Sequence, residues 1–188
     1  IPEDIEMVLA DDASSLDRKP TRSTRSQFLG MPFDQVSFAH VLDELRASGT
    51  EQAARYVVTP NADHVVKLSR NGKLAFIYDD AWLSLCDSKP VWAMSRYLKG
   101  GLDHVTGSDL TAHMFKSVLR AGDPVALIVA NHAIADAMIS KYPDLIFRIH
   151  VPPARLADHR DAFDACVDFL AAQPARFSFI AIGAPQSE

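Results

Sequence analysis

The stretch Pro124-Val125-Ala126-Leu127-Ile128-Val129-Ala130 decides the fold of this 188-residue chain. It is apolar throughout and has the length of a single strand. A continuous apolar strand indicates a parallel sheet covered on both faces, because neither side of such a strand meets water. A helix is predicted directly after it, over residues 131–142, so the stretch opens a strand–helix unit.

The same alternation of strands and helices extends in both directions along the chain. The expected strands are residues 28–33, 55–59, 82–86, 124–130, 145–151 and 176–182. The expected helices are residues 38–48, 63–70, 73–78, 90–98, 108–120, 131–142 and 158–172. In the last helix, Phe163, Val167 and Leu170 recur at helical spacing, and we expect them to form its buried stripe. The alternation predicts an α/β protein with a mostly parallel sheet and helices on both faces.

The first 27 residues differ in composition from the rest of the chain. Beyond Leu9 they are poor in apolar residues, and residues 11–27 mix acidic, hydroxyl and basic side chains. Such a segment buries too little apolar surface to offset the entropy of ordering. We therefore expect residues 1–27 to form a flexible arm and residues 28–188 to form one α/β domain.

Composition excludes several classes of function. Hydrophobic residues make up 48% and charged residues 23%, which is enough for a real core, and the formal net charge is -5. An acidic balance argues against a protein that lives on nucleic acid. The cysteines, Cys86 and Cys166, show no metal-ligand spacing and favour a reduced cytosolic setting. No apolar run has the length of a transmembrane helix, and the sequence shows no signal-peptide pattern.

Polar breaks follow apolar runs at four places in the chain. They are Thr59-Pro60-Asn61-Ala62-Asp63, Asp87-Ser88, Thr106-Gly107-Ser108-Asp109-Leu110 and Gly183-Ala184-Pro185-Gln186. In open α/β proteins, ligands bind just beyond the carboxyl ends of parallel strands. Three of these breaks look like strand ends, so we expect the breaks to converge on one crevice.

Each break has a chemical interpretation and a structural one. Asp87, at the lip of a crevice, suits a general base, but it also suits a helix cap or an Asx turn. The hydroxyl of Thr59 and the amide of Asn61 suit a sugar or phosphate, although Asn61 equally suits a helix cap. The Gly107 helix start would attract a phosphate, or it is an ordinary cap at which Asp109 complements the helix dipole. Gly183 would let backbone approach a ligand closely, or would simply make a turn.

Familiar catalytic motifs are missing from the sequence. It contains no G-x-G-x-x-G, Walker loop, H-E-x-x-H or G-x-S-x-G. The usual support for dinucleotide binding, nucleotide hydrolysis, zinc proteolysis and serine hydrolysis is therefore absent. The histidines are scattered without metal-ligand spacing, so we expect no metal site.

Taken in order, the polar segments resemble those of the WecG/TagA/CpsF glycosyltransferases. The matching segments are Thr59-Pro60-Asn61-Ala62-Asp63-His64, Asp87, Val91-Trp92-Ala93, Val105-Thr106-Gly107-Ser108-Asp109-Leu110, Gly183-Ala184-Pro185 and Glu188. The resemblance spans about residues 28–188. It implies a Rossmann-like fold and an enzyme of bacterial surface polysaccharide or teichoic-acid synthesis.

The resemblance also implies a reaction and its participants. Such enzymes transfer a sugar from a UDP-sugar, often an N-acetylmannosamine derivative, to a polyprenyl-diphosphate-linked acceptor at the cytoplasmic face of the membrane. They invert the anomeric centre and need no metal or other cofactor. Asp87 matches the proposed base, and family members form oligomers. Around it we expect substrate-binding residues at Thr59, Asn61, Asp63, Ser88, His104, Gly107, Ser108, Asp109, Ala130, Asn131, Gly183, Pro185, Gln186, Ser187 and Glu188.

The sequence departs from the family pattern at four positions. Ser88 stands where the family usually has glycine, and His104 stands where it commonly has arginine. Ala130-Asn131 replaces a Gly-Gly pair that lets backbone approach the nucleotide, and Ser187 replaces a glutamine near the substrate. The family also uses a C-terminal extension for membrane association and to complete the site. The sequence stops before this extension, either as a piece of a longer protein or as a shortened member, which leaves open the activity of this chain alone.

Two other functions stay open at this point. The departures favour a nucleotide-sugar-binding module that has lost catalysis and serves as an assembly or regulatory partner. An unrelated Rossmann-like oxidoreductase is a third interpretation, against which the missing glycine fingerprint argues.

Overall fold

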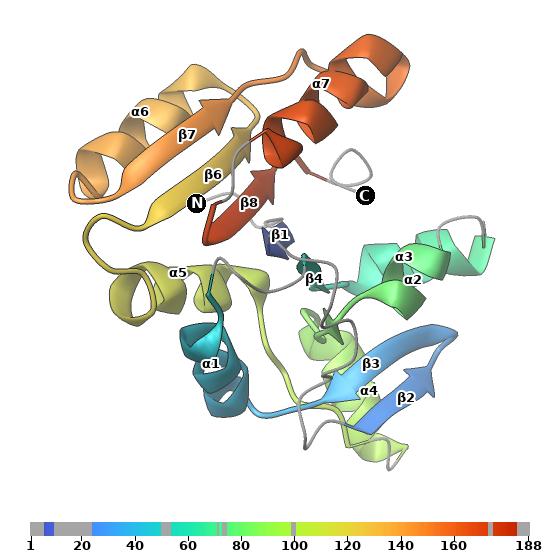
Figure 1. Cartoon of the computed structure of the whole chain (residues 1–188). Helices are drawn as coiled ribbons and strands as arrows, with labels where there is room; N and C mark the ends of the chain where they lie inside the picture. The colour runs from blue at the N-terminus through green and yellow to red at the C-terminus, as the bar shows by residue number, and fades with distance from the viewer. Residues whose placement is uncertain are drawn as a thin grey trace.

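The computed structural model describes residues 6–9, 24–49, 54–70, 72, 75–98, 101–172 and 175–183. Within them the chain forms a six-stranded sheet of order β5-β4-β1-β8-β6-β7 and a separate two-stranded hairpin, β2-β3 (Figure 1). The strands are β1 (Glu6–Leu9), β2 (Thr24–Phe28), β3 (Met31–Gln35), β4 (Arg55–Val58), β5 (Leu83–Ser84), β6 (Pro124–Val129), β7 (Ile146–His150) and β8 (Phe177–Ala181). The helices are α1 (Phe38–Ala47), α2 (Ala62–Arg70), α3 (Ala75–Asp80), α4 (Lys89–Tyr97), α5 (Gly107–Ser117), α6 (His132–Lys141), α7 (Arg160–Ala171) and the short 3-10 helix η2 (Leu156–Asp158).

Five of the six strands in the large sheet run in one direction. β4 is parallel to β5, and β6 is parallel to both β7 and β8. β1 is antiparallel to β4 and to β8, so these two strands point the same way. The predicted Rossmann-like α/β class, with a mostly parallel sheet, is confirmed. The carboxyl ends of all five parallel strands meet at one edge.

Parts of the first 27 residues are ordered into strands, where a flexible arm was expected. Residues 6–9 form β1 in the middle of the large sheet, and residues 24–27 belong to β2. The rest of the expected arm, residues 1–5 and 10–23, lies outside the described residues. A strand as short as β1 is stabilised by hydrogen bonds to neighbours on both of its edges, which no local pattern in the sequence reveals.

Helices cover both faces of the sheet, as predicted. One face packs against α1, α5 and α6, through buried residues such as Leu45, Met114 and Phe179. The other face is covered in two parts. Helix α7 and η2 pack over Ile128, while the hairpin and helices α2 to α4 pack over Val58. Figure 1 shows α7 and α4 at opposite ends of the molecule.

Helix α7 buries a different stripe from the predicted one. Phe163 and Val167 are 41% and 49% exposed, whereas Cys166 is buried and packs with Ile128. Leu170 packs partly against the same cluster, as expected. The helix carries two overlapping apolar stripes at helical spacing, and the sheet surface it covers selects the one that contains Cys166.

The predicted strand over residues 28–33 is interrupted by a tight turn, since Phe28 ends β2 and the strand expected over residues 31–33 belongs to β3. Phe28 pairs with Met31, so Leu29 and Gly30 form a two-residue hairpin loop. Their φ angles are 54° and 77°. A loop with positive φ at both central residues matches the right-handed twist of the strands, but it normally uses Asn-Gly or Gly-Gly. A leucine in the left-handed region costs roughly 1 kcal/mol.

A buried ion pair attaches the hairpin to the large sheet. Arg25 of β2 contacts both carboxylate oxygens of Asp34, whose side chain is fully buried. The guanidinium also donates to the Ala81 carbonyl at 2.7 Å. Asp34 Oδ2 in turn accepts a hydrogen bond of 2.9 Å from the Ser84 N–H of β5. This network fixes β5, the strand that leads into Asp87.

None of the described helices is both long and apolar enough to span a membrane.

Candidate active site at the carboxyl edge of the sheet

Asp87 lies where two strand ends and one helix start meet. Its N–H donates to the Pro60 carbonyl at 3.1 Å, which ties it to the end of β4. Its carboxylate Oδ2 accepts a hydrogen bond of 2.8 Å from the Gly107 N–H, the first residue of α5. The preceding residue, Cys86, forms a parallel bridge with His104. Three of the predicted polar breaks are therefore brought together around one half-buried carboxylate.

The N-terminus of α5 already holds an anion of the protein itself. Besides Gly107, the Asp109 N–H donates to Thr106 Oγ1 and the Leu110 N–H donates to the Thr106 carbonyl, both at 3.0 Å. The Ser108 hydroxyl lies 3.2 Å from Thr106 Oγ1. A helix N-terminus attracts negative charge, and here the Asp87 carboxylate supplies it. A phosphate would have to bind beside this carboxylate.

Asn61 caps α2 and is held by a buried histidine. Its Oδ1 accepts from the N–H groups of Asp63 at 2.9 Å and His64 at 3.3 Å. The Asn61 N–H lies 3.1 Å from His64 Nδ1, and His64 is buried. Asn61 is thus a helix cap, which is the structural role that the sequence allowed for it. Thr59 is half-buried and directly follows β4.

Asp63 makes a surface ion pair. Its carboxylate lies 2.6 Å from Lys67 Nζ, one turn along α2. Hydrogen bonding to Lys67 lowers the pKa of the exposed Asp63. The structure therefore gives this carboxylate a solvent-facing partner on its own helix.

The residues at the first two departures from the family pattern have local roles. Ser88 is buried and caps α4, since its Oγ accepts from the Val91 N–H at 3.3 Å. The half-buried His104 ring lies 6.1 Å from the Trp92 ring of α4. Both residues therefore link the site to α4, one through its N-terminus and the other through an aromatic contact.

The ends of β6 and β8 lie at the same edge as the Asp87 cluster. The pairing register aligns Val57, Phe179 and Leu127 across the sheet, and their strands run the same way. The polar breaks after β4, β6 and β8 consequently leave the sheet at a similar level. Gly183, after β8, has a φ of 79°, which is a conformation that favours glycine.

At the third departure, Ala130 and Asn131 follow β6 in a conformation that needs no glycine. Neither residue has a positive φ. Asn131 caps α6, because its Oδ1 accepts from the Ile134 N–H at 3.0 Å. The remaining predicted site residues, Pro185, Gln186, Ser187 and Glu188, lie outside the described residues.

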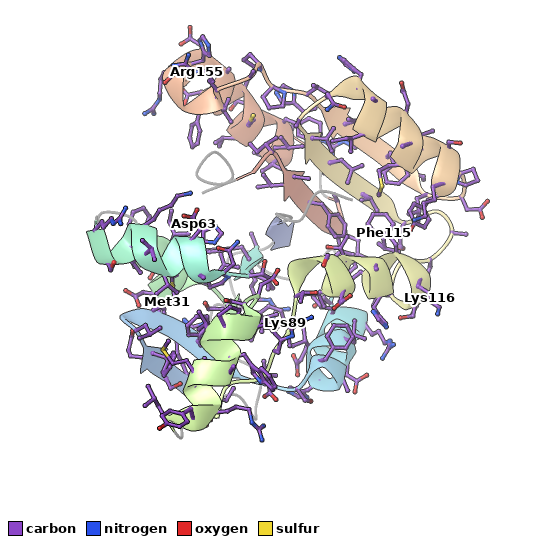
Figure 2. All side chains as sticks on the ribbon, turned by 180° about the vertical axis from the view of Figure 1, so that it is seen from behind. Met31, Asp63, Lys89, Phe115, Lys116 and Arg155 are labelled. Carbon is purple, nitrogen blue, oxygen red and sulfur yellow. The ribbon has the colours of Figure 1, made fainter. Side chains whose placement is uncertain are left out.

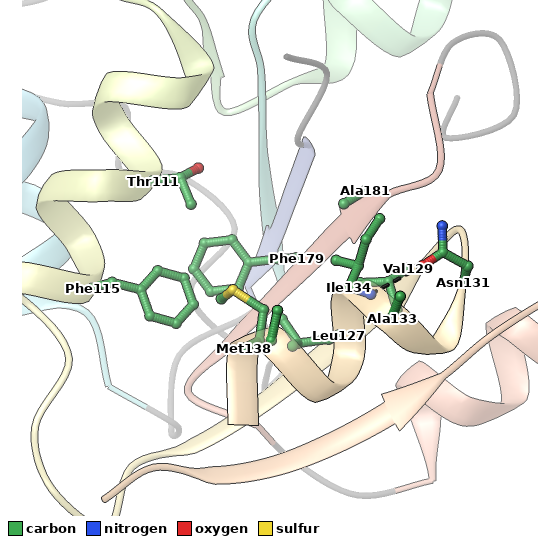
Figure 3. A pocket seen from close by; sticks show the side chains of 11 residues that line it. Thr111, Phe115, Leu127, Val129, Asn131, Ala133, Ile134, Met138, Phe179 and Ala181 are labelled. Atoms are coloured by element: carbon green, nitrogen blue, oxygen red, sulfur yellow. Dashed lines mark hydrogen bonds between the residues drawn. The ribbon is translucent and has the colours of Figure 1, made fainter. Parts of the chain in front are cut away.

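An apolar pocket of about 390 Å³ opens between α5 and α6, above β6 and β8 (Figure 3). Its lining is Thr111, Phe115, Leu127, Val129, Asn131, Ala133, Ile134, Ala137, Met138, Phe179 and Ala181. Most small-molecule sites are concave and largely apolar, with a few polar groups for orientation, as here Thr111 and Asn131. Of these residues, only Asn131 was predicted from the sequence. Thr111 is the only other polar residue of the lining, so its residue type is the one further signal that the sequence offered. The remaining lining residues are apolar and cannot be distinguished from core residues in the sequence.

Helix α5 connects the pocket to the Asp87 cluster. Gly107 at its start touches Asp87, and Thr111 lines the pocket one turn later. Four residues of helix span about 6 Å. One element therefore presents a polar end to the strand breaks and an apolar flank to the pocket.

Two observations bear on other kinds of chemistry. Among the described residues, no group of three or more histidine, cysteine or acidic side chains is placed to hold a metal ion. Burial raises the pKa of the Cys86 thiol to about 11, so this neighbour of Asp87 is uncharged at neutral pH. A thiol in that state is a poor nucleophile.

The fold and the site define an α/β protein with a ligand crevice at the carboxyl edge of its sheet, bordered by an apolar pocket. Residues 26–188 match the glycosyl transferase family WecG/TagA/CpsF, and the chain belongs to this family. The predicted resemblance is thereby confirmed. No curated protein is similar enough to count as a match. The family indicates a glycosyltransferase of polysaccharide synthesis that uses a sugar nucleotide and a lipid-linked acceptor.

Proposed function

We propose that this protein transfers a sugar from a UDP-sugar to a polyprenyl-diphosphate-linked acceptor, with inversion, at the inner face of the cell membrane. The donors to consider carry an N-acetylmannosamine-type, glucosyl or uronic sugar. One observation carries the proposal: the Gly107 N–H···Asp87 hydrogen bond places a carboxylate at the start of a helix that also lines a pocket. A donor with an apolar-faced base, a diphosphate and a sugar suits that arrangement.

The nucleoside end of the donor is assigned to the pocket between α5 and α6. The pocket is large enough for a base, and Thr111 and Asn131 are the polar residues of its lining. The turn of helix from Thr111 back to Gly107 then leads the diphosphate toward the strand breaks. His104, when protonated, would offer positive charge to the departing diphosphate in place of the family's arginine.

The acceptor end of the reaction is assigned to Asp87. Its carboxylate takes the proton from the acceptor hydroxyl while that oxygen bonds to the anomeric carbon. The bond from the anomeric carbon to the diphosphate breaks, and UDP leaves with the electron pair. A single displacement of this kind inverts the anomeric centre. The Gly107 N–H and the Pro60 carbonyl fix the orientation of Asp87, which keeps its carboxylate positioned toward the acceptor hydroxyl during the reaction.

A UDP-release assay tests this function. It uses a panel of UDP-sugars with a short-chain polyprenyl-diphosphate-sugar acceptor, and Asp87→Asn as the matched variant. We expect release that depends on both acceptor and one donor class, and that disappears in Asp87→Asn. Release by the variant at the wild-type rate would remove Asp87 from the chemistry.

A second function is a nucleotide-sugar-binding module without catalysis. The hydrogen bond from the Gly107 N–H to Asp87 favours it if that bond serves only to cap α5. A carboxylate that accepts from a helix N-terminal N–H is also an ordinary cap. UDP binding by wild type without transfer to any acceptor would support this module. An oxidoreductase would instead bind NAD(P), which the same binding experiment can include.

A further inference from the structure

Helix α4 exposes an apolar surface although it begins directly beside the candidate active site. Its inner side is anchored by the buried Val91 and Ser95. On the other side Tyr97 is 87% exposed, and Met94 and Leu98 are 45% and 57% exposed. A single exposed apolar side chain needs no explanation, but a group of them on one helix indicates a partner.

The exposed residues of α4 form one continuous stripe. Successive residues of a helix are turned by about 100°. On that spacing the order around the helix is Ala93, Tyr97, Pro90 and Met94, next to Leu98, which caps the end of the helix, and all of them are exposed. The two cations, Lys89 and Arg96, lie together along one border of this stripe. Arg96 is held there by the Trp92 ring, 5.7 Å from its guanidinium carbon.

The charge of this surface distinguishes it from other exposed apolar positions. Lys89 and Arg96 are the only charged residues of α4, whereas the whole chain has a net charge of -5. Helix α7 also exposes apolar side chains, Phe163 and Val167, but it carries three aspartates and one arginine. An apolar stripe with a cationic border and no acidic residue is complementary to an anionic lipid surface.

We propose that the outward face of α4, formed by Ala93, Tyr97, Pro90, Met94 and Leu98 with Lys89 and Arg96, docks on an anionic lipid bilayer. Tyrosine prefers the interface between headgroups and acyl chains, and cations bind anionic headgroups. The helix lies in the plane of the surface, with its apolar stripe about 5–10 Å deep in the interface. Figure 2 shows α4 extending from Lys89 to the end of the molecule farthest from Arg155.

This docking would bring the site to its acceptor, and in that respect it rests on the proposed function. Ser88, which caps α4, directly follows Asp87. The nine-residue helix is about 13 Å long, so even its far end is close to the Asp87 cluster. An acceptor anchored in the bilayer presents its diphosphate and sugar just outside the headgroup layer, within reach of Asp87.

Vesicle flotation tests the docking surface. The full chain is mixed with phosphatidylcholine vesicles that contain or lack phosphatidylglycerol. We expect binding only to the anionic vesicles, weakened by salt. The double variant Met94→Glu/Tyr97→Glu should bind about tenfold or more weakly, and Phe163→Glu on α7 should bind like wild type. Equal binding of the α4 variant and wild type, or no binding by wild type, would overturn the proposal.

Two further measurements distinguish a membrane-docking surface from an interface between copies of the chain and from a part of the catalytic machinery. Light scattering in solution should show the same mass for wild type and the α4 variant. A larger wild-type assembly that the variant disperses would make α4 an interface between copies and would overturn membrane docking. Transfer to a short-chain acceptor in the absence of vesicles should not change in the α4 variant. If transfer is absent but vesicle binding persists, the proposed reaction fails while the docking surface stands.

Discussion

The two halves of the sheet's carboxyl edge differ in chemistry. At the ends of β4 and β5 the edge is polar, with Asp87 fixed by Pro60 and Gly107. At the ends of β6 and β8 it borders an apolar pocket in which Thr111 and Asn131 are the polar members. Helix α5 belongs to both halves. The difference indicates a division of labour, in which the polar half does the chemistry and the apolar half holds the ligand.

The largest expected effect comes from removing the charge of the polar half. Asp87→Asn keeps an oxygen that can accept from the Gly107 N–H, so the fold should be preserved. As loss of a general base, it should lower kcat by about 10²–10⁴-fold, measured as acceptor-dependent UDP release. A loss of activity that is accompanied by a loss of thermal stability would show instead that Asp87 is a structural cap.

The next effect concerns how the polar half is held in place. Asp34→Ala leaves Arg25 without its buried partner and removes the acceptor of the Ser84 N–H. Breaking a buried ion pair costs about 3–5 kcal/mol in free energy of unfolding, measured by urea denaturation. Asp43→Ala, which breaks the exposed pair with Arg46, is the matched control and should cost less than about 1 kcal/mol. Similar losses in both variants would contradict the anchoring role of Asp34.

The buried thiol of Cys86, beside Asp87, is expected to make the free energy of unfolding depend on pH, with an effect of intermediate size. Burial raises the pKa of Cys86 from 9.0 to about 11, so the folded chain retains a proton that the unfolded chain loses first. Stability is therefore unaffected below about pH 9 and falls by roughly 2–3 kcal/mol as the pH rises to about 11. In Cys86→Ala the slope of unfolding free energy against pH should flatten over this range. An unchanged slope would place the Cys86 thiol in contact with water.

The smallest effect lies in the hairpin that covers the polar half. Leu29 has a φ of 54°, which asparagine adopts more readily than leucine. Leu29→Asn should therefore stabilise the fold by about 1 kcal/mol, measured by thermal denaturation. A loss of stability would mean that the exposed Leu29 side chain makes a contact worth more than the backbone strain.

The polar half was predictable from the sequence because its residues interrupt apolar runs. Thr59, Asp87 and Gly107 each follow such a run, and the rule that parallel strands end at one edge was enough to bring them together. Alternation of strands and helices likewise predicted the class of fold. The local capping signal at Asn61 was also sufficient, because a cap depends only on its own helix.

The features that could not be predicted depend on contacts between distant segments. β1 exists through pairing with β4 and β8, and nothing local marks it. The buried side of α7 is chosen by the sheet surface beneath it, not by helical spacing alone. The apolar pocket is invisible for a related reason, since residues that line a cavity and residues that fill a core have the same composition.

The division of labour is tested most directly by UDP binding, measured calorimetrically on wild type, Asp87→Asn, Ala137→Phe and the control Ser140→Phe. Ala137 is an exposed residue of α6 that lines the pocket, whereas Ser140 lies on α6 outside it. We predict that Asp87→Asn and Ser140→Phe bind UDP within about twofold of wild type, while Ala137→Phe binds about tenfold or more weakly. Unchanged binding by Ala137→Phe, together with lost binding by Asp87→Asn, would contradict this division of labour.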